Sequence, residues 1–149
     1  MTDLADLTAL FGNIEDQNRG AELELRDPVT GAPTGMKIRI AGPDSKIQTH
    51  ARQQAQDELA DLLPEYRRRV GQTIKAKDRE RISVEMLARC VLSWNLQQDG
   101  QDVPCTHETI VRVLTAAAWV REQVDEFAGS RTPYWKTPAT TPKTKKGAK

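Results

Sequence analysis

Apolar and charged residues alternate in two short stretches near the start of the chain, the period-two pattern of half-buried β-strands. Leu23 and Leu25 alternate with charged residues in the first stretch, and Ile38 and Ile40 do so in the second. The segment between them reads Asp-Pro-Val-Thr-Gly, which is typical of a turn because Pro fixes φ and Gly accepts a positive φ. We therefore predict an antiparallel hairpin over about 21–41, with the four aliphatic side chains facing the rest of the protein.

The apolar positions after the hairpin recur every three or four residues, as in an amphipathic helix. We expect a first helix from about Ser45 towards Val70, with the side chain of Asp44 or Ser45 as its cap. Pro64 lies inside this pattern and should kink or end the helix near Leu63. Because a hairpin of this size is not stable alone in water, it should pack on this helix and on those that follow.

Two further helices are expected in the second half of the chain. The second should begin after Gly71 and place Cys90 and Trp94 on its apolar side, with Trp94 at its end. The third should begin after Thr106, a good N-cap, and end at Gly129, where a C-cap glycine belongs. The expected fold class is therefore α+β, with one N-terminal β-hairpin packed on about three α-helices.

Three regions differ in composition. Residues 1–19 are acidic and carry apolar side chains at helical spacing; these are Leu4, Leu7, Leu10, Phe11 and Ile14. This segment is either a packed or frayed terminus or an amphipathic helix that binds a partner. Residues 20–135 form the expected single α+β domain. Residues 136–149 hold five lysines, no acidic residue and almost nothing to bury, so we expect a disordered Lys/Pro/Thr tail.

Charge and composition narrow the class of protein. The formal net charge is +1, but residues 1–135 carry 17 basic and 21 acidic side chains, a net of −4. No apolar run approaches the length of a membrane span, and no secretory signal is visible. Two cysteines give no disulfide framework, so a cytosolic, reducing location is the simplest expectation.

The sequence contains no recognisable catalytic or metal site. His50 and His107 have no orienting partner in view, so we interpret both as ordinary surface residues. Cys105 and His107 lack the spacing of structural zinc ligands, and Cys90 lies on an apolar helix face, where it is expected to be a small buried hydrophobe. We therefore expect no enzyme activity, no cofactor and no bound metal.

Seven basic residues and three acidic residues lie between Glu65 and Arg81; the basic ones are Arg67, Arg68, Arg69, Lys75, Lys77, Arg79 and Arg81. This cluster could contact phosphates of nucleic acid, or it could be a solvated helix end that complements the helix dipole. No aromatic platform interleaves with it except Tyr66, which belongs to the apolar ladder. We favour the solvated helix end, with an acidic partner surface as an intermediate interpretation.

Five apolar residues are candidates for contact with a partner protein. Trp119 stands beside three alanines and is offset from the apolar stripe of the third helix, although it could equally face a second buried surface. Tyr134 and Trp135 follow Gly129 with no stripe to join, so they are either exposed interface residues or folded back on the domain. Leu7 and Phe11 belong to the N-terminal stripe and complete the candidate set.

Several motifs occur in an order that carries a family resemblance. They are Asp-Pro-Val-Thr-Gly-Ala-Pro-Thr-Gly at 27–35, Gly-Pro-Asp-Ser at 42–45, Trp94, the polar linker 99–104 and the capped helix from Thr106. Each motif is ordinary turn or cap chemistry, and their order and spacing are the signal. In these respects the chain resembles the tail assembly chaperones of long-tailed, siphovirus-type bacteriophages, over about residues 20–135.

The resemblance implies a small, non-catalytic protein that coats the hydrophobic helices of the tape measure protein and helps to recruit tail tube subunits. It also implies action in the cytoplasm of the infected host, or of a bacterium carrying a prophage, and absence from the mature particle. It leaves open homo-oligomer formation and a longer, frameshifted form. Two alternatives remain: a structural tail or head–tail connector protein, and a basic-patch nucleic-acid-binding protein, against which the net charge of −4 argues.

Overall fold

A computed structural model describes residues 6–135 of the chain, so the predicted tail 136–149 and Leu4 lie outside the described residues. The fold is α+β, as expected, but with more and shorter helices. The helices are α1 (Leu7–Arg19), α2 (Lys46–Leu62), α3 (Glu65–Arg69), α4 (Ala76–Arg89), α5 (His107–Ala116), α6 (Ala118–Ala128) and the 3-10 helix η1 (Thr132–Tyr134). The strands are β1 (Ala21–Arg26), β2 (Pro33–Ile40), β3 (Val91–Trp94), β4 (Gln97–Gln98) and β5 (Gln101–Asp102).

The predicted hairpin is present as β1 and β2, which pair antiparallel with Leu23 opposite Ile38. Leu25, Ile38 and Ile40 are buried in the core, and Leu23 is partly buried against it. An irregularity in β2, where Gly35 has a φ of 82°, adds residues to that strand and none to β1. The period of two therefore identified the buried face of the sheet.

The hairpin gains a third strand that the sequence pattern assigned to a helix. We expected the second helix to run to Trp94, but α4 ends at Arg89 and β3 pairs antiparallel with β2. The amide of Ala41 donates a hydrogen bond to the carbonyl of Cys90 at 2.9 Å, and Trp94 pairs with Ile38. Pairing with an existing strand overrides the local preference of a four-residue segment.

The polar linker that follows is a turn, as predicted, but it also forms a small hairpin of β4 and β5. Asp99 and Gly100 have φ values of 52° and 80°. Positive φ at both central residues is the requirement of a type I′ turn, and Asp-Gly is one of the pairs that adopt it. The indole nitrogen of Trp94 donates a hydrogen bond to the carbonyl of Val103 at 2.7 Å and ties this hairpin to β3.

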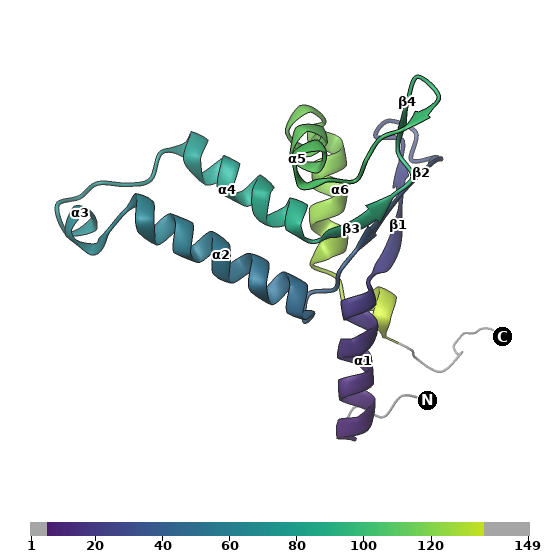
Figure 1. The fold of residues 1–149 in the computed structure, drawn as a ribbon, viewed down its shortest axis with the longest axis horizontal. Coiled ribbons are helices and arrows are strands. Elements are labelled where there is room, and N and C mark those ends of the chain that lie inside the picture. The colour runs from purple at the N-terminus through teal and green to yellow at the C-terminus, as the bar shows by residue number, and fades with distance from the viewer. Residues whose placement is uncertain (1–5, 136–149) are drawn as a thin grey trace.

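Helices α2 and α4 form an antiparallel arm that projects from the body, with α3 at its tip (Figure 1). Of the two predicted caps, Ser45 is the one that caps α2, since its hydroxyl accepts the amide of Gln48 at 3.1 Å. The helix ends at Leu62, before Pro64, which is one of the two effects predicted for that proline, and the apolar pattern towards Val70 continues in the separate helix α3. Along the arm, Glu58 of α2 lies 3.6 Å from Arg81 and 3.7 Å from Arg89 of α4.

The predicted third helix is divided into α5 and α6 at Ala117, where φ is −113° and ψ is 89°. Its ends are where the sequence placed them: Thr106 caps α5, and Gly129 follows α6. No Gly or Pro marks the break. The change of direction allows Leu114 of α5 and Val124 of α6 both to enter the core.

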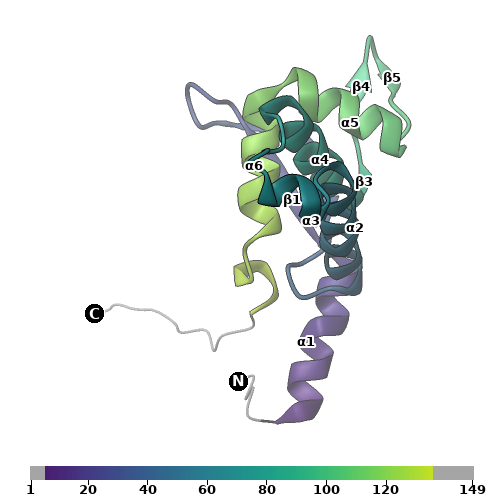
Figure 2. The same ribbon diagram turned by 90° about the vertical axis from the view of Figure 1, so that its left-hand side faces the viewer.

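The core lies between one face of the three-stranded sheet and the helices α4, α5 and α6, joined by the first half of α2 (Figures 1 and 2). The most deeply buried side chains in it include Leu25, Ile38, Ile40, Leu114 and Val124. Helix α1 stands apart from this core and points away from it, in a different direction from the α2–α4 arm.

Candidate partner-binding surface

Helix α1 is attached to the body by its C-terminal half only, while its first turns extend beyond the body (Figures 1 and 2). The carboxylate of Asp6 accepts the amide of Thr8 at 2.8 Å and caps the helix. The attachment is mainly polar. One half of the segment is therefore packed, and the other half is an exposed part of the same helix.

Gln17 is the centre of the attachment, and it is fully buried. Its side-chain oxygen accepts the amide of Asp44 at 2.6 Å, and its side-chain nitrogen donates to Asn13 at 2.8 Å and to Asp44 at 3.2 Å. Its backbone carbonyl accepts the amide of Gly42 at 2.9 Å. A buried amide with all these partners is satisfied, and it holds α1 against the start of α2.

Arg131 connects Asp44, and through it the attachment of α1, to the C-terminal segment. Its guanidinium donates two hydrogen bonds to the carboxylate of Asp44, at 2.7 and 2.8 Å. The hydrogen bond from Arg131 is the main reason why the pKa of Asp44 lies below its usual value of 3.8. The side-chain nitrogen of Asn13 also donates to the carbonyl of Tyr134 at 2.8 Å, so α1 and η1 support each other.

Tyr134 is buried, which decides between the two interpretations left open for it. Its hydroxyl donates a hydrogen bond to the carbonyl of Ile40 at 2.9 Å, and burial raises the pKa of the phenol. The C-terminal segment therefore folds back on the sheet, and Tyr134 is not available to a partner. Its neighbour Trp135 is left at the surface beside α1.

An apolar surface results, which we call the α1–Trp135 surface; its residues are Leu7, Leu10, Phe11, Ile14 and Trp135. Leu7 is 64% exposed, Phe11 58% and Trp135 45%. A hollow of about 290 Å³ lies between the helix and the tryptophan, lined by Leu10, Asn13, Ile14, Asp44, Arg131 and Trp135. The leucine and phenylalanine positions repeat every three or four residues, so they form one stripe along α1.

Trp119 does not belong to this surface. It lies in the first turn of α6, is partly buried and packs against the core. The five predicted contact residues are therefore divided by the structure: Leu7, Phe11 and Trp135 are exposed at one end of the molecule, and Trp119 and Tyr134 are engaged in packing. The polar anchors Gln17, Asp44 and Arg131 were not predicted, and the Gly-Pro-Asp-Ser motif containing Asp44 was the only signal near them.

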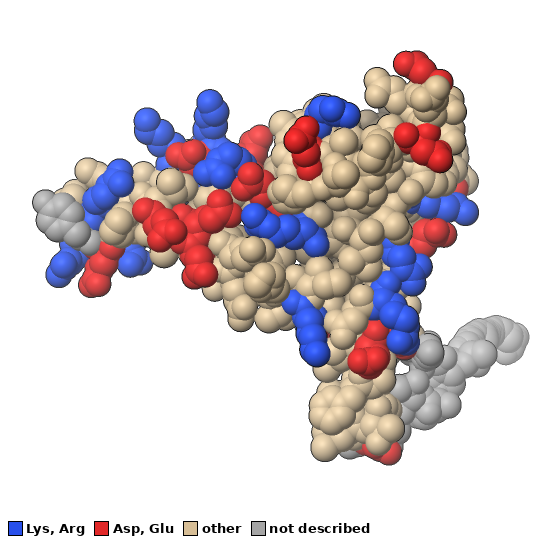
Figure 3. Space-filling model, in the orientation of Figure 1, with Lys and Arg blue, Asp and Glu red and all other residues tan. Residues whose placement is uncertain are grey.

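The basic cluster surrounds the tip of the α2–α4 arm, where Figure 3 shows blue side chains on several sides. Arg67, Arg68 and Arg69 are exposed on α3, and none of them forms an ion pair with another described residue. The guanidinium of Arg67 instead donates to the side chain of Gln72 at 2.8 Å. Arg81, by contrast, is paired with carboxylates of both arm helices.

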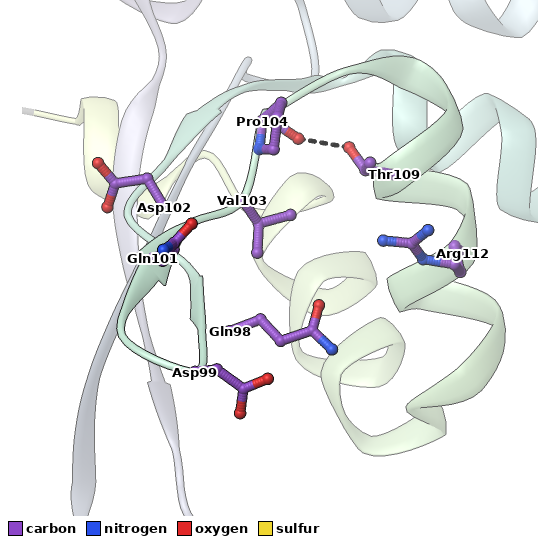
Figure 4. Close-up of a pocket in the computed structure, with 8 residues that line it drawn as sticks. All are labelled: Gln98, Asp99, Gln101, Asp102, Val103, Pro104, Thr109 and Arg112. Atoms are coloured by element: carbon purple, nitrogen blue, oxygen red, sulfur yellow. Dashed lines mark hydrogen bonds between the residues drawn. The ribbon is translucent and has the colours of Figure 1, made fainter.

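A second hollow, of about 390 Å³, lies between the β4–β5 hairpin and the start of α5 (Figure 4). Arg112 and Gln98 point into it, while Asp102 points away, and the hydroxyl of Thr109 donates to the carbonyl of Pro104. Of the polar side chains that line it, Thr109 is partly buried and the others, including Gln98 and Arg112, are exposed. Without a buried polar group to fix a ligand, this hollow offers no preorganised binding chemistry.

The two histidines considered for catalysis or zinc lie on different helices. His50 is exposed on α2 and His107 is exposed at the start of α5. Cys90 is buried, as predicted, and burial raises the pKa of its thiol to about 11. Among residues 6–135, no group of three or more His, Cys, Asp or Glu side chains is placed to hold a metal ion.

Comparison of the chain with protein-family models, with curated proteins and with solved structures gave no match. Within the described part of the chain, none of the helices combines the length and the apolar character that crossing a membrane requires.

Proposed function

We propose that this protein is a tail assembly chaperone of a long-tailed bacteriophage, which binds the tape measure protein and keeps its apolar helices dispersed until tail tube subunits assemble around them. It would act in the cytoplasm of the host and be absent from the finished particle. The α1–Trp135 surface is the proposed contact. Recruitment of tube subunits is part of the same proposal.

One observation carries the proposal: large apolar side chains stand exposed on a helix that is firmly attached at its other end. Leu7 and Phe11 contribute nothing to the core, and exposed apolar groups gathered at one place are typical of protein-binding surfaces. A holdase needs such a surface and needs no reactive group. The order of turn and cap motifs in the sequence supports the same family.

The two alternatives have less support. A tail tube protein closes rings through extensive sheets. The described residues form one three-stranded sheet and a separate hairpin whose two strands have two residues each. A nucleic-acid-binding role would rest on the tip of the α2–α4 arm, where no described aromatic side chain offers a stacking surface with the exposed arginines.

Co-expression with the tape measure protein of the same genome tests the proposal. We expect the tape measure protein to remain in the supernatant with the wild-type chain and to sediment without it, because a binder lowers the free population of exposed apolar helices. The triple variant Leu7→Ser, Phe11→Ser, Trp135→Ser should lose this effect while keeping the circular dichroism spectrum of the wild type.

A matched control uses apolar residues that are equally exposed elsewhere. Val29 in the hairpin turn is 90% exposed and Val70 at the arm tip is 58% exposed. The double variant Val29→Ser, Val70→Ser should keep the tape measure protein in the supernatant. If the triple variant still protects it, the binding surface is elsewhere; if the wild type gives no protection, the chaperone assignment is wrong.

A further inference from the structure

Strand β1 lies at one edge of the three-stranded sheet, because β2 is its only strand neighbour among residues 6–135. At its last residue this edge is covered by a side chain rather than by a strand. The side-chain oxygen of Gln123 accepts the amide of Arg26 at 2.9 Å, and its side-chain nitrogen donates to the carbonyl of Arg26 at 2.8 Å. A carboxamide from α6 thus makes the two bonds that a neighbouring strand would make.

The direction of the remaining backbone groups follows from this pair. In an antiparallel strand, successive residues point their amide and carbonyl to opposite sides. The backbone amide and carbonyl of Arg26 point to the open side of β1. The carbonyl of Leu25 points to the opposite side, where the hydroxyl of Thr34 donates to it at 2.7 Å. Because β1 contains no inserted residue, Glu24 and Glu22 point to the open side together with Arg26.

The hydrogen bonds of β2 also show that the backbone groups of Glu24 face the open side. Leu23 and Ile38 face each other, and the next residue, Lys37, turns its carbonyl towards β3, where it accepts the amide of Asn95 at 3.1 Å. Its partner in β1, Glu24, therefore cannot be bonded to Lys37 and faces outward. No hydrogen bond between described residues reaches the outward amide or carbonyl of Glu22 or Glu24.

A groove runs beside these free groups. It has a volume of about 390 Å³ and is lined by Leu23, Glu24, Arg26, Gln123, Glu126, Phe127 and Ser130, so it separates β1 from α6. Leu23 and Phe127 are half-buried and form its apolar floor. An open strand edge beside a helix is the arrangement in which extended peptides add as a further strand.

The charges of the groove select the peptide. The carboxylates of Glu24 and Glu126 lie along it, and neither forms an ion pair with a described residue, although one oxygen of Glu24 accepts the amide of Gly35 at 3.0 Å. The side chain of Arg26 is directed towards the hairpin turn, since its guanidinium donates to the carbonyl of Gly31 at 3.2 Å. A basic side chain opposite Glu24, flanked by apolar side chains that lie over Leu23 and Phe127, complements both the charge and the floor.

We propose that the groove between β1 and α6 binds an extended segment of a partner protein, which adds antiparallel to β1 as a fourth strand and has alternating apolar and basic residues. Glu22 and Glu24 provide the backbone hydrogen bonds, and Gln123 closes the groove at Arg26. This site is separate from the α1–Trp135 surface, so it does not depend on the chaperone assignment.

The experiment uses the full chain and the capped peptide acetyl-Val-Lys-Val-Lys-Val-amide. Titration followed by amide NMR should shift the signals of Glu22 and Glu24, and an Hα–Hα contact should appear between Leu23 and the central Val of the peptide. A matched peptide with both Lys backbone nitrogens methylated keeps every side chain and the charge but cannot donate to β1. It should bind at least about tenfold more weakly, since it loses the backbone hydrogen bonds.

A variant of the protein tests the charge separately. The substitutions Glu24→Gln and Glu126→Gln should leave the Leu23 contact in place and reduce the salt dependence of peptide binding. Equal affinity for the methylated peptide, or unchanged signals of Glu22 and Glu24, would overturn the proposal. A dimer in sedimentation, with the Glu24 amide protected from exchange before any peptide is added, would also overturn it and assign the edge to a second copy of the chain.

Discussion

Gln17 and Gly42 are in such close contact that a side chain on Gly42 has no space. The Gly42 amide donates to the Gln17 carbonyl at 2.9 Å, and a Cβ atom on Gly42 would stand 2.7 Å from the Cβ and Cγ atoms of Gln17. This contact joins the helix that carries the exposed apolar stripe to the loop before α2. The position of α1 therefore depends on a residue with no side chain.

The substitution Gly42→Ala should loosen α1. Displacing Gln17 weakens its bonds to Asp44 and Asn13, and a forced contact of this kind costs about 1–3 kcal/mol. Hydrogen exchange of the α1 amides should accelerate, and the thermal midpoint should fall. Gly12→Ala is the matched control in the same helix, where nothing lies within 4 Å of the new methyl group. It should leave α1 protected or increase its protection, because Ala favours a helix over Gly.

The ion pair between Asp44 and Arg131 should make the docking of α1 sensitive to acid. The pKa of Asp44 is lowered in the folded protein, so its contribution to stability is complete above the unfolded value of 3.8 and is lost as the pH falls through the folded value. Asp44→Asn should lower the thermal midpoint at neutral pH, and its difference from the wild type should shrink as the pH decreases below about 4. Arg131→Gln should reproduce this loss at neutral pH; a difference that stays constant down to about pH 2 would contradict the linkage.

The substitution Ile38→Asp should destabilise the whole domain. Ile38 is 1% exposed and lies in the middle strand of the sheet, so the variant buries an unpaired carboxylate among apolar side chains. The free energy of unfolding should fall by about 3–5 kcal/mol. Chemical denaturation measures the change, and Val29→Asp, in the exposed turn, should be close to neutral. An unchanged unfolding midpoint for Ile38→Asp would be incompatible with this packing.

The exposed arginines of α3 should give only weak binding to DNA. No described aromatic side chain stands beside them as a stacking surface, so binding should lack sequence preference and fall steeply with salt. Fluorescence anisotropy with a labelled duplex at two salt concentrations measures this, and replacing Arg67, Arg68 and Arg69 by Gln should remove most of it. Tight, sequence-selective binding at physiological salt would favour the nucleic-acid-binding alternative.

Patterns within a segment predicted the parts of the fold that depend on local chemistry. The hairpin, the cap at Ser45, the end of α2 before Pro64 and the caps at Thr106 and Gly129 are where the sequence indicated. In each case, neighbouring residues decide the conformation: a turn residue, a capping hydroxyl or a missing amide proton.

Features that depend on distant residues were missed. Val91–Trp94 continues the apolar pattern of a helix, and only the presence of β2 beside it makes it a strand. Tyr134 looked unattached because its acceptor, the carbonyl of Ile40, is 94 residues away. Gln17 reads as a polar helix residue, and nothing within α1 shows that it is buried against Asp44.

Trp135 gives the protein an intrinsic optical reporter. Trp94 and Trp119 are partly buried, and the indole of Trp94 is hydrogen-bonded within the protein, whereas Trp135 is nearly half exposed beside the α1 stripe. An indole that leaves water for an apolar contact emits at shorter wavelengths. Occupation of the hollow beside α1 should therefore shift the emission of the unlabelled chain to the blue. The Trp135→Phe variant should show no such shift.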